Sequence, residues 1–296
     1  MATRRSPRRT TKRFNHEVTF GSIAEMADAY HGRPGVKDAG DHVTPNGIGG
    51  GWLEDWHGVG SLTELRTLAN HGWQDVEADA MTIVESVLEG VERTYDLDVF
   101  TPFYDVAGGT VDIDRFLTGE PECMVNYLPV PTTDVGRVIT LCASVCYSAG
   151  VSIRTIKRRG HTVAALALAL TRIGLAVELW VDISCGPGAG QVHRCRVLVK
   201  GANDELDVAK IMFAYAHPAV LRGLFFGVAN GYPEDIRTAV GIPNRYGSPV
   251  APKRDLPEGT IYLPEVCSSH DVPDAYREVE RTLRELGVLT DDNATV

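Results

Sequence analysis

The sequence predicts an α/β protein with a central, mostly parallel sheet and a helical segment before it. The first observation is residues 137–183, which give a buried strand, a small polar loop, one long helix and a second buried strand. Strands joined by a crossover helix run parallel. The second is that the first strand segment is a nearly continuous apolar run, which is typical of a strand covered on both faces.

Composition divides the chain into three parts. Residues 1–14 carry six basic side chains and no acid, residues 15–130 show mostly helical patterns, and Pro129 and Pro131 mark the start of the α/β domain at residues 131–296. The first part offers nothing that could be buried to offset the entropy of ordering, so we expect a disordered basic arm.

The region 15–130 contains two helices that share a start signal. Ser22 and Ser61 are each followed three residues later by glutamate, the capping-box pattern, which predicts helices over 22–30 and 61–72. A longer helix follows over 76–95, and its acids read as a solvated face. Residues 100–130 break into short pieces, ending in an apolar strand over 123–128, and their acids match no calcium loop.

The α/β domain continues with further elements in a regular order. The sequence predicts a strand over 138–145, a helix over 152–173, strands over 176–183 and 195–200, helical segments over 206–215 and 219–228, a strand over 260–263 and a terminal helix over 274–286. Gly186–Gly190 reads GPGAG. Its proline removes an amide donor and a strand follows it, so we expect a hairpin connection and not a phosphate loop.

Charge and cysteine content limit the protein class. The arm removes six of 29 basic residues, so the remaining chain has 23 against 39 acids, a formal charge of −16. That body should repel nucleic acid, whereas the arm should attract it or an acidic protein. No secretory or membrane-spanning pattern is present, and the six cysteines contain no C-x-x-C pair, so we expect a soluble cytoplasmic protein with reduced thiols.

Sequence motifs for catalysis are absent. The chain has no G-x-S-x-G, H-E-x-x-H or Walker A pattern, and the glycines at 47–51 neither follow a strand nor open a helix. His217 lies beside a proline within an apolar helical segment, which favours a hydrogen-bonded structural histidine over a catalytic one.

The start of the long helix is the candidate anion site. Ligands of parallel sheets gather at the carboxyl ends of strands, and helix N-termini attract anions. We expect five residues to lie there: Ser144, Ser148, Ser152, Arg154 and Arg158. Cations are unfavourable at this end of a helix dipole, so their clustering predicts an anionic ligand or an acidic partner surface. The alternative is ion pairing with acids of the same chain.

The strand, serine-bearing loop, long helix, second strand, edge strand and helix together resemble the von Willebrand factor type A fold, a Rossmann-like α/β class. That fold has a D-x-S-x-S metal motif after its first strand, where this chain has Ser144-Val145-Cys146-Tyr147-Ser148. Serine replaces the carboxylate and cysteine the first hydroxyl. The resemblance therefore implies a degenerate site with no metal or other cofactor, and a divalent cation is disfavoured.

Three further segments are similar to an uncharacterised family encoded by actinobacterial phages and prophages. They are S-L-T-E-L…N-H-G-W (61–73), G-E-P-E-C-M-V (119–125) and S-I-R-T-I-K-R-R-G (152–160). This resemblance implies a bacterial host cell, with a virion location as an alternative.

These features predict a non-enzymatic phage-type protein that associates with another protein. Six residues of the arm would contact nucleic acid or an acidic partner: Arg4, Arg5, Arg8, Arg9, Lys12 and Arg13. Two alternatives stay open. The protein could act on a phosphorylated or nucleic-acid ligand at the sheet crevice, or it could be a structural virion component.

Overall fold

The computed structural model describes most of the chain. The described residues are 15–31, 57–95, 102–108, 110–127, 138–148, 150–188, 191–240, 248–249 and 256–290. The arm and the glycines at 47–51 lie outside them.

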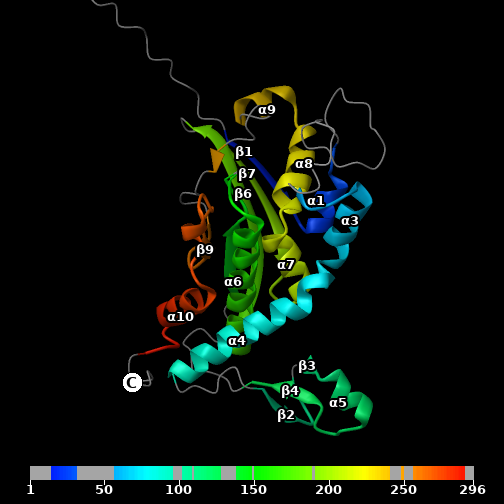
Figure 1. Cartoon of the computed structure of the whole chain (residues 1–296), viewed down its shortest axis with the longest axis vertical. Coiled ribbons are helices and arrows are strands. Elements are labelled where there is room, and N and C mark those ends of the chain that lie inside the picture. The colour runs from blue at the N-terminus through cyan, green and yellow to red at the C-terminus, as the bar shows by residue number, and fades with distance from the viewer. Residues whose placement is uncertain are drawn as a thin grey trace, which may run out of the picture.

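The molecule is built on a mixed sheet with the strand order β1-β7-β6-β5-β9, and β8 pairs with β6 beside this path (Figure 1). Three of its five strand pairings are parallel, namely β1 with β7, β5 with β6, and β5 with β9. The two pairings of β6 with β7 and β8 are antiparallel. The strands are β1 (Asn15–Phe20), β5 (Val138–Ser144), β6 (Ala176–Gly188), β7 (Gln191–Lys200), β8 (Ser248–Pro249) and β9 (Ile261–Leu263).

The predicted strand–helix–strand unit is confirmed. Val138 pairs with Ala176 and Ser144 with Asp182 in an unbroken parallel register, and helix α6 (Ile153–Arg172) connects the two strands. The predicted hairpin is confirmed too, because β6 turns directly into antiparallel β7 with Gly188 opposite Gln191.

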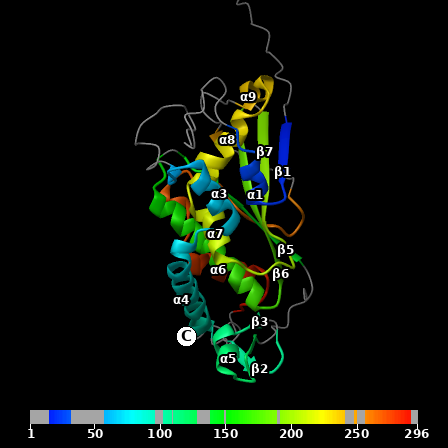
Figure 2. The same ribbon diagram turned by 90° about the vertical axis from the view of Figure 1, so that its right-hand side faces the viewer.

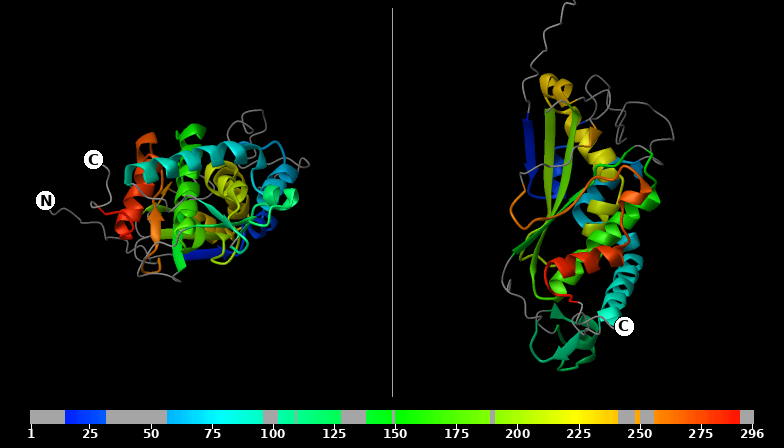
Figure 3. Two further views of the ribbon diagram at one scale, coloured as in Figure 1. Left: turned by 90° about the horizontal axis from the view of Figure 1, so that it is seen from below. Right: turned by 90° about the vertical axis from the view of Figure 1, so that its left-hand side faces the viewer.

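The expected burial of strand β5 on both faces is confirmed over residues 141–144. The two faces differ in their cover, because the helices that contact the sheet lie on one side of it (Figures 2 and 3). Successive side chains of a strand point to opposite faces. Ile139, Leu141 and Ala143 are therefore on one face in the apolar core, whereas Cys142 and Ser144 are on the other.

The N-terminal strand β1 was not predicted. Residues 15–20 were expected to belong to a helical region, and β7 was expected at the edge of the sheet. Instead β1 pairs with β7 over six residues, so β1 forms that edge. Its sequence NHEVTF alternates polar and larger side chains, with Val18 and Phe20 against the core, and this period of two was the available signal.

The helices before β5 follow the sequence closely. Ser22 caps α1 (Ile23–Asp28) and Ser61 caps α3 (Leu62–His71) by accepting hydrogen bonds from the amides of Glu25 and Glu64. The two glutamates accept from the amides of Gly21 and Gly60, one residue earlier than a capping box requires. A 3-10 turn, η1 (Gln74–Val76), leads into α4 (Glu77–Tyr95).

Residues 103–126 form a small separate unit, which we call the appendage. It contains β2 (Phe103–Asp105), β3 (Thr110–Val111), helix α5 (Ile113–Thr118) and β4 (Met124–Asn126), in a three-stranded antiparallel sheet of order β2-β4-β3. Figure 1 shows it at the lower end of the long axis, below α4.

The C-terminal half adds helices to the core. Helix α7 (Val208–Ala216) is capped by Asp207, whose side chain accepts a hydrogen bond from the amide of Lys210. The predicted break at His217-Pro218 is present. The remaining elements are the π-helix η2 (Val220–Phe225), α8 (Phe226–Asn230), α9 (Glu234–Val240), the 3-10 turn η3 (Ser269–Asp271) and α10 (Ala275–Glu285).

A single apolar cluster joins both sides of the boundary expected near residue 130. Met26, Leu65 and Val84 belong to the same cluster as Leu166 and Val181. The helices before β5 therefore belong to the same core as the α/β sheet, because they pack on the helices that cover the sheet.

Candidate functional site

The predicted anion site begins at the N-cap of α6. Ser152 adopts an extended backbone and its Oγ accepts a hydrogen bond from the amide of Thr155 at 3.2 Å. The same oxygen lies 3.0 Å from Thr155 Oγ1. A serine in this position satisfies one of the open amides of the first turn, which explains why the helix begins at Ile153.

The cations of this helix have internal partners. Arg158 donates from one nitrogen to the carbonyl oxygens of Ser269 at 2.7 Å and Val272 at 2.6 Å. Arg159, next to it and almost fully buried, donates to the carbonyl oxygen of Pro264 at 2.7 Å. Both arginines therefore hold the segment after β9 against the start of α6.

Two further cations differ in their surroundings. Lys157 lies with its Nζ 4.8 Å from the ring centre of Trp73, a cation–π contact. Arg154 is exposed. The alternative of ion pairs with acids of the same chain is not what the structure uses for Arg158 and Arg159, because their partners are backbone carbonyls.

The serines of the predicted site differ in how deeply they are buried. Ser144 is buried at the end of β5, and its Oγ accepts from the amide of Cys146 at 3.2 Å. Ser148 is half-buried, and its amide donates to the carbonyl oxygen of Val266 at 3.0 Å. Ser144, Ser148 and Ser152 thus follow the carboxyl end of β5, but Ser144 faces the helix-free side of the sheet.

Three aspartates, Asp182, Asp204 and Asp207, were candidates to supply the carboxylate that the loop after β5 lacks. Asp182 lies opposite Ser144 on β6, whereas Asp204 and Asp207 follow the antiparallel strand β7 and lie at the opposite end of the sheet. Within the described part of the chain, no group of three or more histidine, cysteine, aspartate or glutamate side chains could hold a metal ion.

Asp182 is the centre of a buried polar group on the helix-free face. Its carboxylate accepts hydrogen bonds from Ser184 Oγ at 3.0 Å and Tyr262 Oη at 3.3 Å, and Arg196 Nε lies 3.9 Å away. Burial raises the pKa of Asp182, against the lowering effect of Ser184 and Arg196. Arg196 is opposite Asp182 on the neighbouring strand.

The nearby thiols are unreactive in this setting. All six cysteines are free, and four of them are buried. Burial raises the pKa of Cys142 and of Cys185 to about 12, and it raises the pKa of Cys146 as well. A thiol with so high a pKa carries almost no thiolate at neutral pH, so it is a poor nucleophile.

His217 has the structural role that the sequence indicated. It is 5% exposed, its Nδ1 accepts from the amide of Ala219 at 3.1 Å, and its ring meets Trp73 edge-on. Burial lowers the pKa of His217 to about 4, and Lys157 adds to the effect. The imidazole is therefore neutral at physiological pH.

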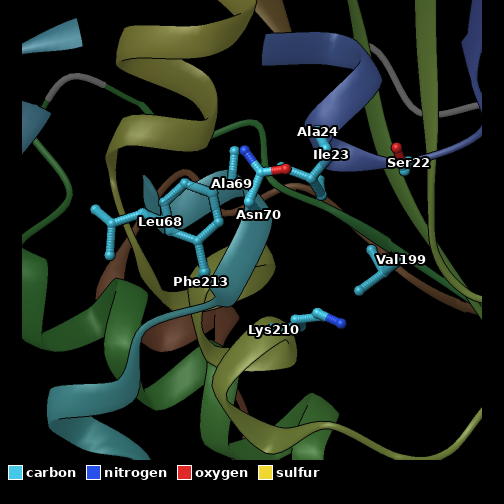
Figure 4. A pocket seen from close by; sticks show the side chains of 9 residues that line it. All are labelled: Ser22, Ile23, Ala24, Leu68, Ala69, Asn70, Val199, Lys210 and Phe213. Atoms are coloured by element: carbon cyan, nitrogen blue, oxygen red, sulfur yellow. The ribbon is translucent and has the colours of Figure 1, made fainter. Parts of the chain in front are cut away.

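A small pocket lies between α1, α3, α7 and β7 (Figure 4). Its volume is about 210 Å³, which is below the usual range for small-molecule sites. Its only charged lining residue, Lys210, pairs with Asp207 at 3.3 Å. It is lined by Ser22, Ile23, Ala24, Leu68, Ala69, Asn70, Val199, Lys210 and Phe213.

The appendage carries the most exposed apolar side chains that the structure describes. Six of its large apolar residues are exposed, and none of its described residues is buried. The six are Phe103, Val106, Val111, Ile113, Phe116 and Leu117. Residues of this kind ordinarily form the core of a small unit. Here they form its surface.

Helix α5 has its polarity reversed. Ile113, Phe116 and Leu117 are spaced i, i+3, i+4, which places them on one helix face, and they are 67%, 63% and 75% exposed. The opposite face meets the small sheet through Arg115, whose guanidinium lies 3.7 Å from the ring centre of Tyr104. The apolar face of the helix is therefore turned to solvent.

The appendage is held together by polar contacts. Asp112 caps α5 by accepting from the amide of Arg115, and its own amide donates to the carbonyl oxygen of Cys123 at 2.8 Å. Arg115 also pairs with Glu120 at 2.9 Å. Because these bonds fix the helix, the apolar face is not needed for the local fold.

A family model described as a domain of unknown function (DUF7192) matches residues 8–290. The chain belongs to this family. No curated protein and no solved structure matches the chain. The range that matches DUF7192 includes the residues of the appendage.

Among the described residues of this DUF7192 chain, no single helix is long and apolar enough to cross a membrane. Helix α7 and the segment Val220–Asn230, which follows it after a bend, are long and apolar enough only when taken together.

Sequence reasoning missed the appendage surface. Residues 100–130 were expected to break into short pieces, and the apolar residues among them were not predicted to form a site. The available signal was the i, i+3, i+4 spacing within IDRFLT, which a sequence alone cannot assign to the inside or the outside of a fold.

Proposed function

We propose that this protein mediates protein association through the appendage, with the basic arm as a second contact. The observation that carries the proposal is the solvent-facing apolar stripe of Ile113, Phe116 and Leu117 on α5. Contiguous exposed apolar surface in soluble proteins marks interaction sites. A stripe at helical spacing is also the pattern by which helices dock into partner grooves.

The rest of the molecule supports a scaffold role. Arg158 and Arg159 donate to backbone carbonyls, the buried thiols have raised pKa values, and the pocket beside α1 is small. None of these features favours turnover over binding. Association needs no cofactor, and we propose none.

The strand that follows the arm in sequence begins at the other end of the molecule. The arm precedes β1, whose first residue Asn15 pairs with Val192 next to the β6–β7 hairpin. The appendage lies at the opposite end of the long axis (Figure 1). Six basic residues in this arm suit a nucleic-acid backbone or an acidic protein. The protein would then connect a nucleic acid to a protein partner.

The setting we propose is a phage or prophage in an actinobacterial host. The similarity of residues 61–73, 119–125 and 152–160 to proteins encoded there supports it. The host cytoplasm is the expected location, and mass spectrometry of purified particles would reveal a virion location instead.

The test compares the wild-type protein with Phe116→Ser/Leu117→Ser in the phage-bearing host. Both carry the same affinity tag, and photo-crosslinking from Thr118 precedes purification. We expect a defined crosslinked partner with the wild type that the double variant loses. The matched control is Ile83→Ser/Ile153→Ser, which changes two exposed apolar residues outside the appendage and should keep the partner.

The arm has its own readout. Deleting residues 1–14 should abolish salt-sensitive binding to duplex DNA or to an acidic protein, while leaving the crosslink from Thr118 unchanged. An unchanged crosslink pattern in Phe116→Ser/Leu117→Ser would overturn the proposal that the appendage is the association surface.

A further inference from the structure

We infer that the appendage binds a basic amphipathic segment of another protein, with apolar residues on one side and lysine or arginine at the rim. This inference rests on the proposed association function and specifies the chemistry of the partner. Its basis is the distribution of charge around the apolar face of α5.

The charge of the appendage is strongly negative. Residues 103–126 contain five acidic residues and one basic residue, Arg115. Arg115 is already occupied, because it pairs with Glu120 and lies over the ring of Tyr104. The structure describes no ion pair for Asp105, Asp114 or Glu122. The excess charge of the appendage is therefore negative.

One of these acids, Asp114, lies beside the apolar stripe. Asp114 follows Ile113 directly, so its exposed carboxylate lies beside the stripe, on the same short helix as Phe116 and Leu117. Interfaces gain affinity from an apolar centre and gain specificity from complementary charge at the rim. A partner with apolar residues and cations satisfies both requirements.

The other possible occupants fit less well. A second copy of the appendage would bring two surfaces of the same negative sign together. The basic arm has the right charge, but its sequence MATRRSPRRTTKRF offers only scattered apolar residues for the stripe. An anionic membrane would be repelled by the acids at the rim.

The test uses two synthetic helical peptides, one with leucines on one face and lysines on the other, and a counterpart in which glutamates replace the lysines. Binding to the full-length protein is measured by fluorescence anisotropy at low and at physiological salt. We expect the Leu/Lys peptide to bind and the Leu/Glu peptide to bind at least about tenfold more weakly, a difference that shrinks with salt.

Variants separate the apolar and the charged contributions. Phe116→Ser/Leu117→Ser should weaken Leu/Lys binding by about tenfold or more. Asp114→Asn/Glu122→Gln should weaken it about two- to fivefold at low salt and remove most of the salt dependence. The matched charge control is Asp79→Asn/Glu89→Gln on α4, where both side chains are exposed, and it should change little.

The outcomes distinguish this inference from the association function. If both peptides bind equally and the charge variant has no effect, the basic partner is refuted while the apolar surface stands. If a Leu/Lys peptide binds only through residues outside the appendage, both ideas fail. Concentration-dependent dimerisation that Phe116→Ser/Leu117→Ser removes would identify a second copy as the occupant. If the wild type does not bind the Leu/Lys peptide but the protein without residues 1–14 does, the arm itself is the occupant of the apolar surface.

Discussion

The Nδ1 atoms of His16 and His193 lie 2.8 Å apart, between the neighbouring parallel strands β1 and β7. Their rings stack, and Tyr232 Oη lies 3.4 Å from the other nitrogen of His193. One of the two Nδ1 atoms must donate and the other must accept, so both imidazoles cannot be protonated while this contact persists.

Acid should therefore destabilise the fold. Burial lowers the pKa of His16, although Asp235 opposes that shift. Burial and, to a smaller extent, the neighbouring His16 together lower the pKa of His193 from 6.5 to about 4. Between these values the unfolded chain binds a proton that the folded chain excludes. Stability is thus complete above about pH 6.5 and falls as pH decreases, by about 3 kcal/mol in total from His193. Urea unfolding at pH 7, 6, 5 and 4.5 would measure the slope.

His193→Phe provides the comparison, because it keeps a ring beside Phe225 but cannot be protonated. Its stability should fall less steeply below pH 6.5 than that of the wild type. His217, whose pKa is also lowered to about 4, contributes in the same pH range and remains in the variant. Equal slopes for wild type and His193→Phe would contradict the assignment.

Arg158 and Arg154 should behave differently although both belong to the predicted anion site. Arg158→Ala removes hydrogen bonds to the carbonyls of Ser269 and Val272, which should cost about 1–3 kcal/mol of unfolding free energy. Arg154→Ala changes an exposed side chain and should cost less than about 0.5 kcal/mol. Thermal unfolding with and without phosphate checks both points. A phosphate-induced rise in Tm that Arg154→Ala abolishes would support the predicted anion site.

At Gly160, helix α6 comes close to Ala216 of α7. A Cβ built there would lie 2.4 Å from the Cβ of Ala216 and 3.1 Å from its Cα. Neither atom can rotate away, so the two helices would have to move apart. Gly160→Ala should destabilise the protein by about 1–3 kcal/mol despite the better helix propensity of alanine. Gly90→Ala on α4 is the control, since it meets only the ring of Tyr276 at 3.3 Å. Chemical denaturation of both variants should show a loss for Gly160→Ala alone.

Ser184 stabilises the ionised form of Asp182. Ser184→Ala removes the 3.0 Å hydrogen bond to a fully buried carboxylate, with an expected cost of about 1–3 kcal/mol at neutral pH. Because the hydrogen bond lowers the pKa of Asp182 against burial, the cost should shrink as pH falls and the carboxyl becomes protonated. Denaturation of wild type and variant at pH 7 and pH 5 measures the difference. A cost that grows toward pH 5 would contradict this account.

The sequence predicted the centre of the fold because apolar runs and a long helix leave few alternatives. Residues 138–145 and 176–183 could be placed side by side from their hydrophobicity alone. It did not predict β1, whose six residues form a strand only because β7 offers them a partner about 175 positions later. Such a pairing has no local signal beyond the alternation of side chains.

The functional surfaces were harder to predict for two different reasons. The cations of α6 resemble an anion site until the carbonyls of Pro264, Ser269 and Val272 are seen beside Arg159 and Arg158, more than a hundred residues away. The stripe on α5 resembles a core face until its exposure is measured. Spacing gives the direction of a side chain, whereas only the assembled neighbours decide whether that direction leads to solvent.

The pairing of β1 with β7 also affects how the chain is made. The ribosome makes residues 15–20 well before their partner strand, which ends at Lys200. The first strand must therefore wait, unpaired, until that strand has been made, and the edge of the sheet can form only then. Contacts of such long range slow folding and prolong the exposure of an unpaired strand to other chains.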